Sequence, residues 1–158
     1  MSVASSLVTA RPDWTGPILR LALGIVMWPH GAQKLLDWFG GHGFAGTMQF
    51  FTGTVHLPWL LGFLVIVIEF FGALCILVGW ASRLWAAAFA GLALGIVFTS
   101  RLQHGFFMNW FGNQKGEGYE YFLLMLGLAG ALLINGGGRY SVDAALHSRP
   151  PAPGSTFA

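Results

Sequence analysis

Long runs dominated by apolar residues occupy most of the chain and set its predicted elements. Four such runs lie at 17–36, 59–79, 84–102 and 119–134, and each is close to the ~20 residues that a helix needs to cross a bilayer. None shows the polar–apolar alternation of a half-buried strand, and an open strand would leave its backbone unsatisfied in lipid. The pattern therefore predicts an all-α polytopic membrane protein with four transmembrane helices packed as a bundle.

The connections between these runs differ in length and character. Only residues 81–83 separate the second helix from the third, which predicts a tight antiparallel hairpin. The segment 37–58 is longer, and apolar side chains recur within it at helical spacing, so we expect a short interfacial or re-entrant helix there. The residues that form this pattern are Phe44, Met48, Phe51 and Val55.

Both ends of the chain differ in composition from the apolar runs. Residues 1–16 are mostly polar, and 144–158 include the proline-rich stretch "RPPAPGSTFA". We expect the first segment to be a polar tail and the second a disordered one. The membrane domain is then predicted to extend over 17–143.

Small residues on the predicted helices indicate how the bundle packs. They recur at four-residue spacing on the third and fourth helices, and two glycines share a face of the first. Such faces allow helix backbones to approach closely in lipid. We expect helix–helix contacts at Gly24, Gly31, Ala87, Gly91, Gly95, Gly127 and Ala131.

The composition narrows the classes of function. The chain is 55% hydrophobic and only 9% charged, whereas soluble domains carry nearer a quarter charged residues, so we expect membrane lipid to surround it. Its basic residues form no run or stripe, which argues against nucleic acid as a partner. The single cysteine, Cys75, excludes an intrachain dithiol. No haem, flavin or nucleotide motif is evident, since the G-x-G-x-x-G at 41–46 follows an apolar helix rather than a strand.

Basic residues near the helix ends predict the orientation. With four spans, both termini lie on one side of the membrane. That side has five arginines and the other has three basic residues, so the positive-inside rule predicts that both termini are cytoplasmic. The first group is Arg11, Arg20, Arg83, Arg139 and Arg149, and the second is Lys34, Arg101 and Lys115.

Glu69 is the most informative polar residue, because it lies in the middle of the second apolar run. At ~1.5 Å per residue it is ~15 Å from either end, where a charge costs ~3 kcal/mol or more. We therefore predict that Glu69 faces the bundle interior, within direct or water-bridged reach of His30 or Lys34 on the first helix. A structural alternative stays open, in which such a pair only fixes the helix register.

Further polar residues fall in the middle or outer half of the predicted bundle. The candidate set for ligand binding or proton relay is Glu69, His30, Lys34, Arg101, His104 and Glu120. In the alternative interpretation, Arg101 reaches to lipid headgroups and His104 and Glu120 are ordinary loop residues. The spacing of these histidines and carboxylates matches no recognised metal-ligand pattern, so we expect no metal site. No residue is singled out as catalytic.

Three segments together resemble the DoxX family of small bacterial membrane proteins. They are "RLALGIVMWPHGAQKL", "EFFGALCILVGWASRLWA" and "HGFFMNWFGNQKGEGYEYFLLMLGLAGALLINGGGRYSVD", and the resemblance covers about 18–143. It implies a four-helix protein of the bacterial inner membrane, in a family named for a subunit associated with a quinol oxidase and with thiosulfate:quinone oxidoreduction.

The resemblance also marks polar positions shared with the family. These positions are Arg20, His30, Lys34, Glu69, Arg83, His104, Glu120, Ser141 and Asp143. Most of the candidate site set recurs among them. The remaining four, Arg20, Arg83, Ser141 and Asp143, are expected to have structural roles.

The leading functional hypothesis is a redox-associated membrane subunit with a pocket for a quinone or another lipid-soluble molecule. A quinone needs donors for its two carbonyls and a proton relay, and the candidate set supplies both. Electrons would come from a partner protein in a membrane oxidoreductase complex, and the chain itself could also dimerise. A small proton-coupled transporter is the alternative, because intramembrane carboxylates and histidines suit proton relays. A non-catalytic scaffold or assembly factor is the third.

Overall fold

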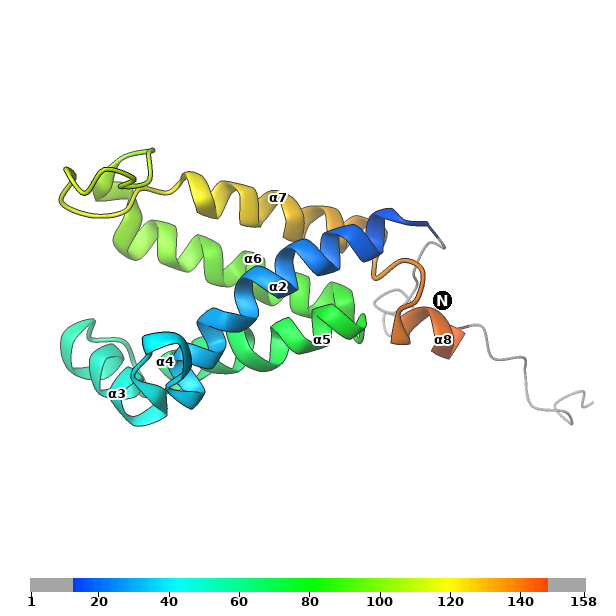
Figure 1. The fold of residues 1–158 in the computed structure, drawn as a ribbon, viewed down its shortest axis with the longest axis horizontal. Helices are drawn as coiled ribbons and strands as arrows, with labels where there is room; N and C mark the ends of the chain where they lie inside the picture. Colours follow the sequence, from blue (N-terminus) through cyan, green and yellow to red (C-terminus); the bar gives the residue numbers. More distant parts are fainter. Residues whose placement is uncertain (1–12, 148–158) are drawn as a thin grey trace, which may run out of the picture.

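A computed structural model describes residues 13–147, and every regular element in that range is helical (Figure 1). The all-α prediction is thus confirmed for this part of the chain. The α-helices are α2 (Thr15–Leu36), α3 (Gly43–Gln49), α4 (Trp59–Val67), α5 (Ala73–Val78), α6 (Ser82–Ile96), α7 (Glu120–Asn135) and α8 (Val142–His147). The π-helical segments are η2 (Phe50–Thr54), η3 (Ile68–Gly72) and η4 (Val97–Arg101), and the 3₁₀ segments are η1 (Trp38–Gly40) and η5 (Leu102–His104).

The π-helical segments join neighbouring α-helices into longer ones. Segment η3 links α4 to α5, so the chain is helical over Trp59–Val78, and η4 and η5 extend α6 to give Ser82–His104. By length and composition these two helices can cross a membrane. Helix α2 has 22 residues and α7 has 16. The helices lie where the apolar runs predicted them, whereas their arrangement as four spans and an interfacial place for α3 and η2 remain predictions.

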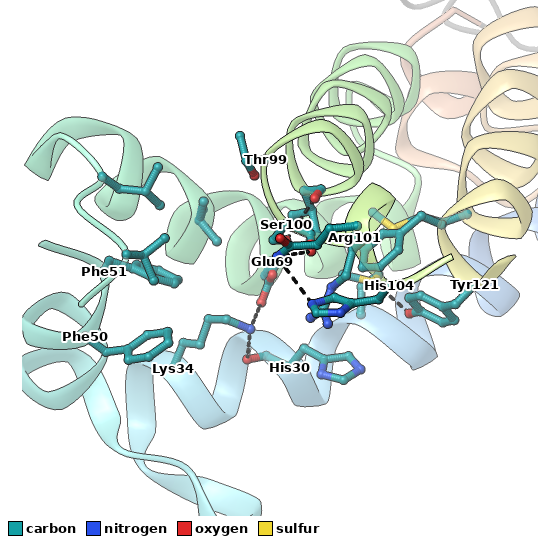
Figure 2. Close-up of a pocket in the computed structure, with 18 residues that line it drawn as sticks. His30, Lys34, Phe50, Phe51, Glu69, Thr99, Ser100, Arg101, His104 and Tyr121 are labelled. Carbon is teal, nitrogen blue, oxygen red and sulfur yellow. Dashed lines mark hydrogen bonds and ion pairs between the residues drawn. The ribbon is translucent and has the colours of Figure 1, made fainter. Parts of the chain in front are cut away.

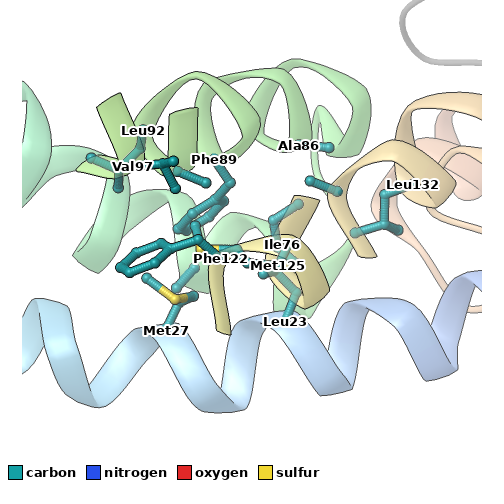
Figure 3. Packing of buried hydrophobic residues seen from close by; sticks show 13 residues of the cluster. Leu23, Met27, Ile76, Ala86, Phe89, Leu92, Val97, Phe122, Met125 and Leu132 are labelled. Carbon is teal, nitrogen blue, oxygen red and sulfur yellow. The ribbon is translucent and has the colours of Figure 1, made fainter. Parts of the chain in front are cut away.

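Helix α2 crosses the other helices and holds the fold together. It packs along α5, η3 and α7, while α6 and α7 pair as neighbours over their length (Figure 1). Large apolar side chains from four helices meet between them (Figure 3). They include Leu23, Met27, Ile76, Phe89, Phe122, Met125 and Leu132. The core therefore lies along α2, where α5, α6 and α7 converge.

Glycines allow α2 to approach the helix that contains Glu69. A Cβ atom added to Gly31 would lie 2.4 Å from the Phe70 nitrogen and 2.5 Å from the Glu69 carbonyl carbon. One added to Gly24 would meet the Leu77 side chain at 2.5 Å. The predicted close contacts at these two glycines are confirmed.

The predicted packing through the glycines of α6 and α7 is wrong. Nothing lies within 4 Å of a Cβ added to Gly91, Gly95 or Gly127. The α6–α7 contact uses a different face of each helix, on which Ala86, Ala93 and Ala129 are fully buried. Small residues occur on both faces of these helices, so their spacing alone could not show which face packs against the neighbouring helix.

A buried arginine ties α2 to the turns at one end of the bundle. Arg20 is only 4% exposed. Its guanidinium donates to the carbonyl oxygens of Leu77 at 2.9 Å, Arg139 at 3.0 Å and Tyr140 at 3.3 Å. Carbonyls at the end of α5 and after α7 would otherwise lack helical partners, so Arg20 satisfies three of them at once.

Asp143 plays the matching role at the N-terminus of α6. Its two carboxylate oxygens accept from the backbone N–H groups of Ala81 at 2.7 Å and Ser82 at 2.9 Å. A negative charge is favourable there, because the helix dipole and the free N–H groups both attract it. Ser141 caps the start of α8 by accepting from the Ala144 N–H at 3.0 Å.

All four residues expected to be structural bond to the backbone. Arg83, the remaining one, donates to the Ile134 carbonyl at 3.0 Å, near the end of α7. Residues 144–147, which were predicted to belong to the C-terminal tail, lie in α8. The predicted polar tail is shorter by Thr15 and Gly16, which begin α2. The predicted disorder of 148–158 lies outside the described residues, as does most of the N-terminal tail.

Candidate functional site

A cavity of about 610 Å³ lies at the end of the bundle away from the Asp143 cap (Figure 2). It is lined by residues of the second half of α2, of η2, η3, η4 and η5, and of the start of α7. Its volume falls within the ~300–1,000 Å³ typical of small-molecule sites. Aromatic and aliphatic side chains form much of the wall, including Phe50, Phe51, Val65, Ile96, Phe122 and Met125.

An ion pair between Lys34 and Glu69 lies in the wall of this cavity. The Lys34 ammonium donates to one carboxylate oxygen of Glu69. The Glu69 side chain is 5% exposed and the Lys34 side chain 24%. The prediction that Glu69 faces the interior beside a basic group of the first helix is therefore confirmed, and the partner is Lys34.

His30, the other predicted candidate, is not the partner of Glu69. Its backbone carbonyl, rather than its ring, accepts a hydrogen bond of 3.4 Å from the Lys34 ammonium. His30 is one of the residues that line the cavity, and its ring lies apart from the Lys34–Glu69 contact (Figure 2). Lys34 is thus held between one backbone carbonyl and one carboxylate.

The backbone contact at Gly31 explains why Lys34 meets Glu69. Because Gly31 has no side chain, α2 lies directly against η3 at Glu69 and Phe70. Lys34 lies three residues after Gly31, close to one helical turn. Its side chain therefore projects from the same face of α2 toward the Glu69 carboxylate. The pair therefore depends on this glycine as well as on its own charges.

Two π-helical segments position the charged residues of the cavity. Glu69 lies in η3, and Arg101 is the last residue of η4. A π-helical turn inserts an extra residue into an α-helix and re-aims the side chains that follow, and such turns are frequent at functional sites. Segment η3 falls within an apolar run and η4 at the polar end of another, and the hydrophobic pattern gave no sign of the extra residue in either.

Arg101 faces the cavity without an acidic partner. Its guanidinium carbon lies 5.8 Å from the centre of the Phe122 ring, a cation–π contact. Its Nε atom is buried and has no hydrogen-bond partner. Within residues 13–147, no carboxylate lies within 4 Å of this guanidinium.

His104 lines the cavity beside Arg101, under a loop (Figure 2). The Nε2 atoms of Gln103 and His104 are 3.4 Å apart. A Cβ atom added to Gly116 would lie 2.7 Å from atoms of the His104 ring, so the backbone of the loop packs directly on the imidazole. The loop 105–118 therefore covers this part of the site.

Glu120 is the one predicted site residue that does not line the cavity. Its carboxylate accepts from the Met108 N–H at 2.9 Å and from the Trp110 indole N–H at 3.2 Å. Glu117 accepts from the Asn109 N–H at 2.6 Å in the same way. These carboxylates order the loop 105–118 rather than contact a ligand.

Four polar lining residues were absent from the predicted set. They are Thr99, Ser100, Gln103 and Tyr121. The Tyr121 hydroxyl donates to the Met27 sulfur at 3.3 Å. Tyr121 could have been predicted, because its phenol lies in an apolar helix next to Glu120. The other three residues line the cavity because η4 and η5 turn them toward it.

The arrangement can hold an oxygen-bearing apolar molecule. Lysine, arginine, glutamine and tyrosine groups present donors, and aromatic walls can accommodate a ring or a chain. Among the described residues, no three His, Cys, Asp or Glu side chains lie together as metal ligands would. The chemistry that these residues support is binding, orientation and proton transfer.

The sequence matches the profile of the DoxX family over residues 17–102, more than half of its 158 residues. The chain belongs to the DoxX family. The matched range contains Lys34, Glu69 and Arg101, so the two π-helical positions of the cavity lie inside it. DoxX proteins are membrane-associated, in agreement with the two helices long and apolar enough to span a bilayer.

A curated relative of this DoxX chain is "Putative oxidoreductase CatD" of Bacillus subtilis (strain 168). The two sequences are 30% identical over 115 residues, which cover 73% of this chain and 75% of the relative. No solved structure matches the chain with significant similarity.

Proposed function

We propose that this DoxX protein is a redox-associated subunit of the bacterial inner membrane whose cavity binds a quinone. Helix α2, the joined helices α4–α5 and α6–η5, and helix α7 cross the bilayer. Helix α3 and η2 lie at its interface, and both termini are cytoplasmic. The positions of basic residues support the orientation, and the name of the CatD relative supports a role in oxidoreduction.

The observation that carries this proposal is the combination of apolar walls and polar donors in one cavity of about 610 Å³. A quinone has a flat apolar ring, an apolar tail and two carbonyl oxygens. In the proposed role the Lys34 ammonium and the Arg101 guanidinium donate to such oxygens, and the Tyr121 hydroxyl does so in exchange for its hydrogen bond to the Met27 sulfur. Aromatic residues such as Phe122 provide surfaces against which the ring can pack.

Proton transfer is the second requirement, because reduction of a quinone to a quinol takes up two protons. The Lys34–Glu69 pair supplies a carboxylate and an ammonium in hydrogen-bond contact. His30 and His104 line the same cavity, and imidazole exchanges protons near neutral pH. In the proposed role, electrons come from a partner protein and this chain holds the quinone and passes protons.

Quinone content of the purified protein tests the proposal. We expect organic extracts of wild-type protein in detergent to contain quinone in a fixed ratio to protein, and Lys34→Gln to lower that ratio. Added decylquinone should raise the melting temperature of the wild type in a saturable way. If no quinone is extracted and the melting temperature does not move, the proposal is wrong. Proton flux into proteoliposomes that requires Glu69, without quinone binding, would indicate the transporter instead.

A further inference from the structure

The charges that line the cavity do not cancel. Lys34 and Glu69 form an ion pair, so their formal charges compensate each other. Arg101 adds a positive charge, and in the part of the chain that the structure describes no carboxylate lies within 4 Å of it. The cavity therefore has an excess of one positive charge before either histidine is counted.

The Arg101 side chain is half-buried, so its guanidinium is partly shielded from water. Its guanidinium lies over the Phe122 ring, and its Nε–H group is sealed from solvent without an acceptor. A charge removed from water is unfavourable unless an opposite charge and hydrogen bonds replace the lost hydration. Guanidinium also presents its donors in a planar fork that matches an oxyanion. The missing partner is most simply an anionic oxygen on the ligand.

The two ends of the cavity differ in polarity: polar side chains gather beside Phe122 at one end, and Phe50 and Phe51 lie at the other. Figure 2 shows Arg101, His104 and Tyr121 on one side of the Lys34–Glu69 pair and Phe50 and Phe51 on the other. A ligand that fills the cavity is therefore charged at one end and apolar at the other.

We propose that the cavity selects an amphiphile with one negatively charged oxygen, which binds the Arg101 guanidinium while its apolar body extends toward Phe50 and Phe51. This rests on the proposed ligand cavity and specifies the class of ligand. An acidic hydroxyl on a quinone ring and the carboxylate of an alkyl chain both offer such an oxygen. A quinone without an acidic group leaves the excess charge of Arg101 unbalanced.

Three probe molecules distinguish a quinone hydroxyl from an alkyl carboxylate as the source of the anionic oxygen. A 2-hydroxy-3-alkyl-1,4-naphthoquinone is an anion at neutral pH, its 2-methoxy ether is neutral, and decanoate is an anion without a ring. Binding is measured by isothermal titration to the full chain in a neutral detergent, so that the micelle does not favour either charge. We expect the hydroxy compound to bind wild type at least about tenfold more tightly than its ether, as charge-assisted hydrogen bonds exceed neutral ones.

Substitution of Arg101 tests whether this residue causes the preference for the hydroxy compound over its ether. Arg101→Gln should reduce this preference to about onefold, and Arg101→Lys should keep part of it. Lys115→Gln is the matched control, because Lys115 is exposed in the loop 105–118 and does not line the cavity. It removes the same charge at the same end of the molecule and should keep the full preference.

Each result bears on the proposal in a distinct way. Equal binding of the hydroxy compound and its ether by wild type would overturn the anion site while the quinone cavity stands. Decanoate binding that depends on Arg101, without binding of either naphthoquinone, would support the anion site and refute the quinone. If no probe binds wild type, both proposals fail. The wild-type comparison decides the matter even if Arg101→Gln does not fold.

Discussion

Gly31 offers a sharp test of how the structure places Glu69 beside Lys34. In the fold, α2 lies against η3 at this glycine, and a Cβ atom there would come within 2.4 Å of the Phe70 backbone nitrogen. Real Cβ atoms do not approach backbone so closely, and a backbone atom cannot move aside by changing a rotamer. Gly31→Ala must therefore separate the two helices at the position of Glu69.

Gly91 is the matched control for this substitution. It is also a helical glycine, in α6, but nothing lies within 4 Å of its added Cβ atom. Both changes gain a similar ~1 kcal/mol of helix propensity, which cancels in the comparison. The remaining difference is the cost of overpacking, about 1–3 kcal/mol. At about 2–4 °C per kcal/mol for a chain of this size, Gly31→Ala should melt about 2–12 °C below Gly91→Ala.

Thermal unfolding in detergent measures this difference. Each variant is purified under the same conditions, checked for a single chromatographic peak, and melted at the same protein and detergent concentrations. Gly31→Ala should melt at or below wild type, and Gly91→Ala at or above it. Equal melting temperatures for the two variants would mean that α2 does not touch η3 at Gly31, and the account of the Lys34–Glu69 pair would be wrong.

Three further predictions follow from individual contacts. Glu69→Leu should be about 1–3 kcal/mol less stable than Glu69→Gln in thermal melts, because only glutamine can still accept a hydrogen bond from the Lys34 ammonium. Equal stabilities of the two variants would contradict the ion pair. Asp143→Ala should lower the free energy of unfolding by about 2 kcal/mol, more than Asp143→Asn, because alanine leaves two N–H groups at the start of α6 without acceptors. An unchanged melting temperature would refute this cap. Glu120→Ala should speed tryptic cleavage after Lys115 several-fold, because the loop loses its carboxylate anchor, and Glu120→Gln should do so less; unchanged cleavage would exclude that role.

Energetic cost made the interior position of Glu69 predictable. The apolar run around it fixed a helix, found at Trp59–Val78, and a carboxylate in the middle of such a run has to face other protein groups. The choice between Lys34 and His30 was not predictable. It depends on the rotation of α2 relative to η3, which the backbone contact at Gly31 determines.

The hydrophobic pattern could not reveal the rest of the cavity. The π-helical turn that holds Glu69 lies inside an apolar run, and the one that holds Arg101 lies at the polar end of another. Their extra residue arises from packing rather than from a local sequence signal. Ser100 and Gln103 reach the cavity only because of this geometry.

Two further mismatches come from side chains whose partners are distant in sequence. Gly91 and Gly95 have the spacing of a packing face, yet the buried small residues of α6 are Ala86 and Ala93. Glu120 lies at the outer start of a helix as expected of a site residue, but backbone and indole N–H groups of the loop occupy its carboxylate. In both cases the residue type suggested a role, but the sequence did not show which group the residue faces in the fold.

The central claim is that the cavity between α2, η3, η4 and α7 is the ligand site, and a cavity-filling variant tests it most directly. Ser100→Trp puts an indole into the cavity, whereas Ala87→Trp puts the same group on the exposed side of α6. The measurement is the dissociation constant of decylquinone for wild type and both variants, each shown to be folded by its melting transition. The account predicts saturable binding by wild type and Ala87→Trp and at least about tenfold weaker binding by Ser100→Trp. Equal affinities for all three proteins would contradict it.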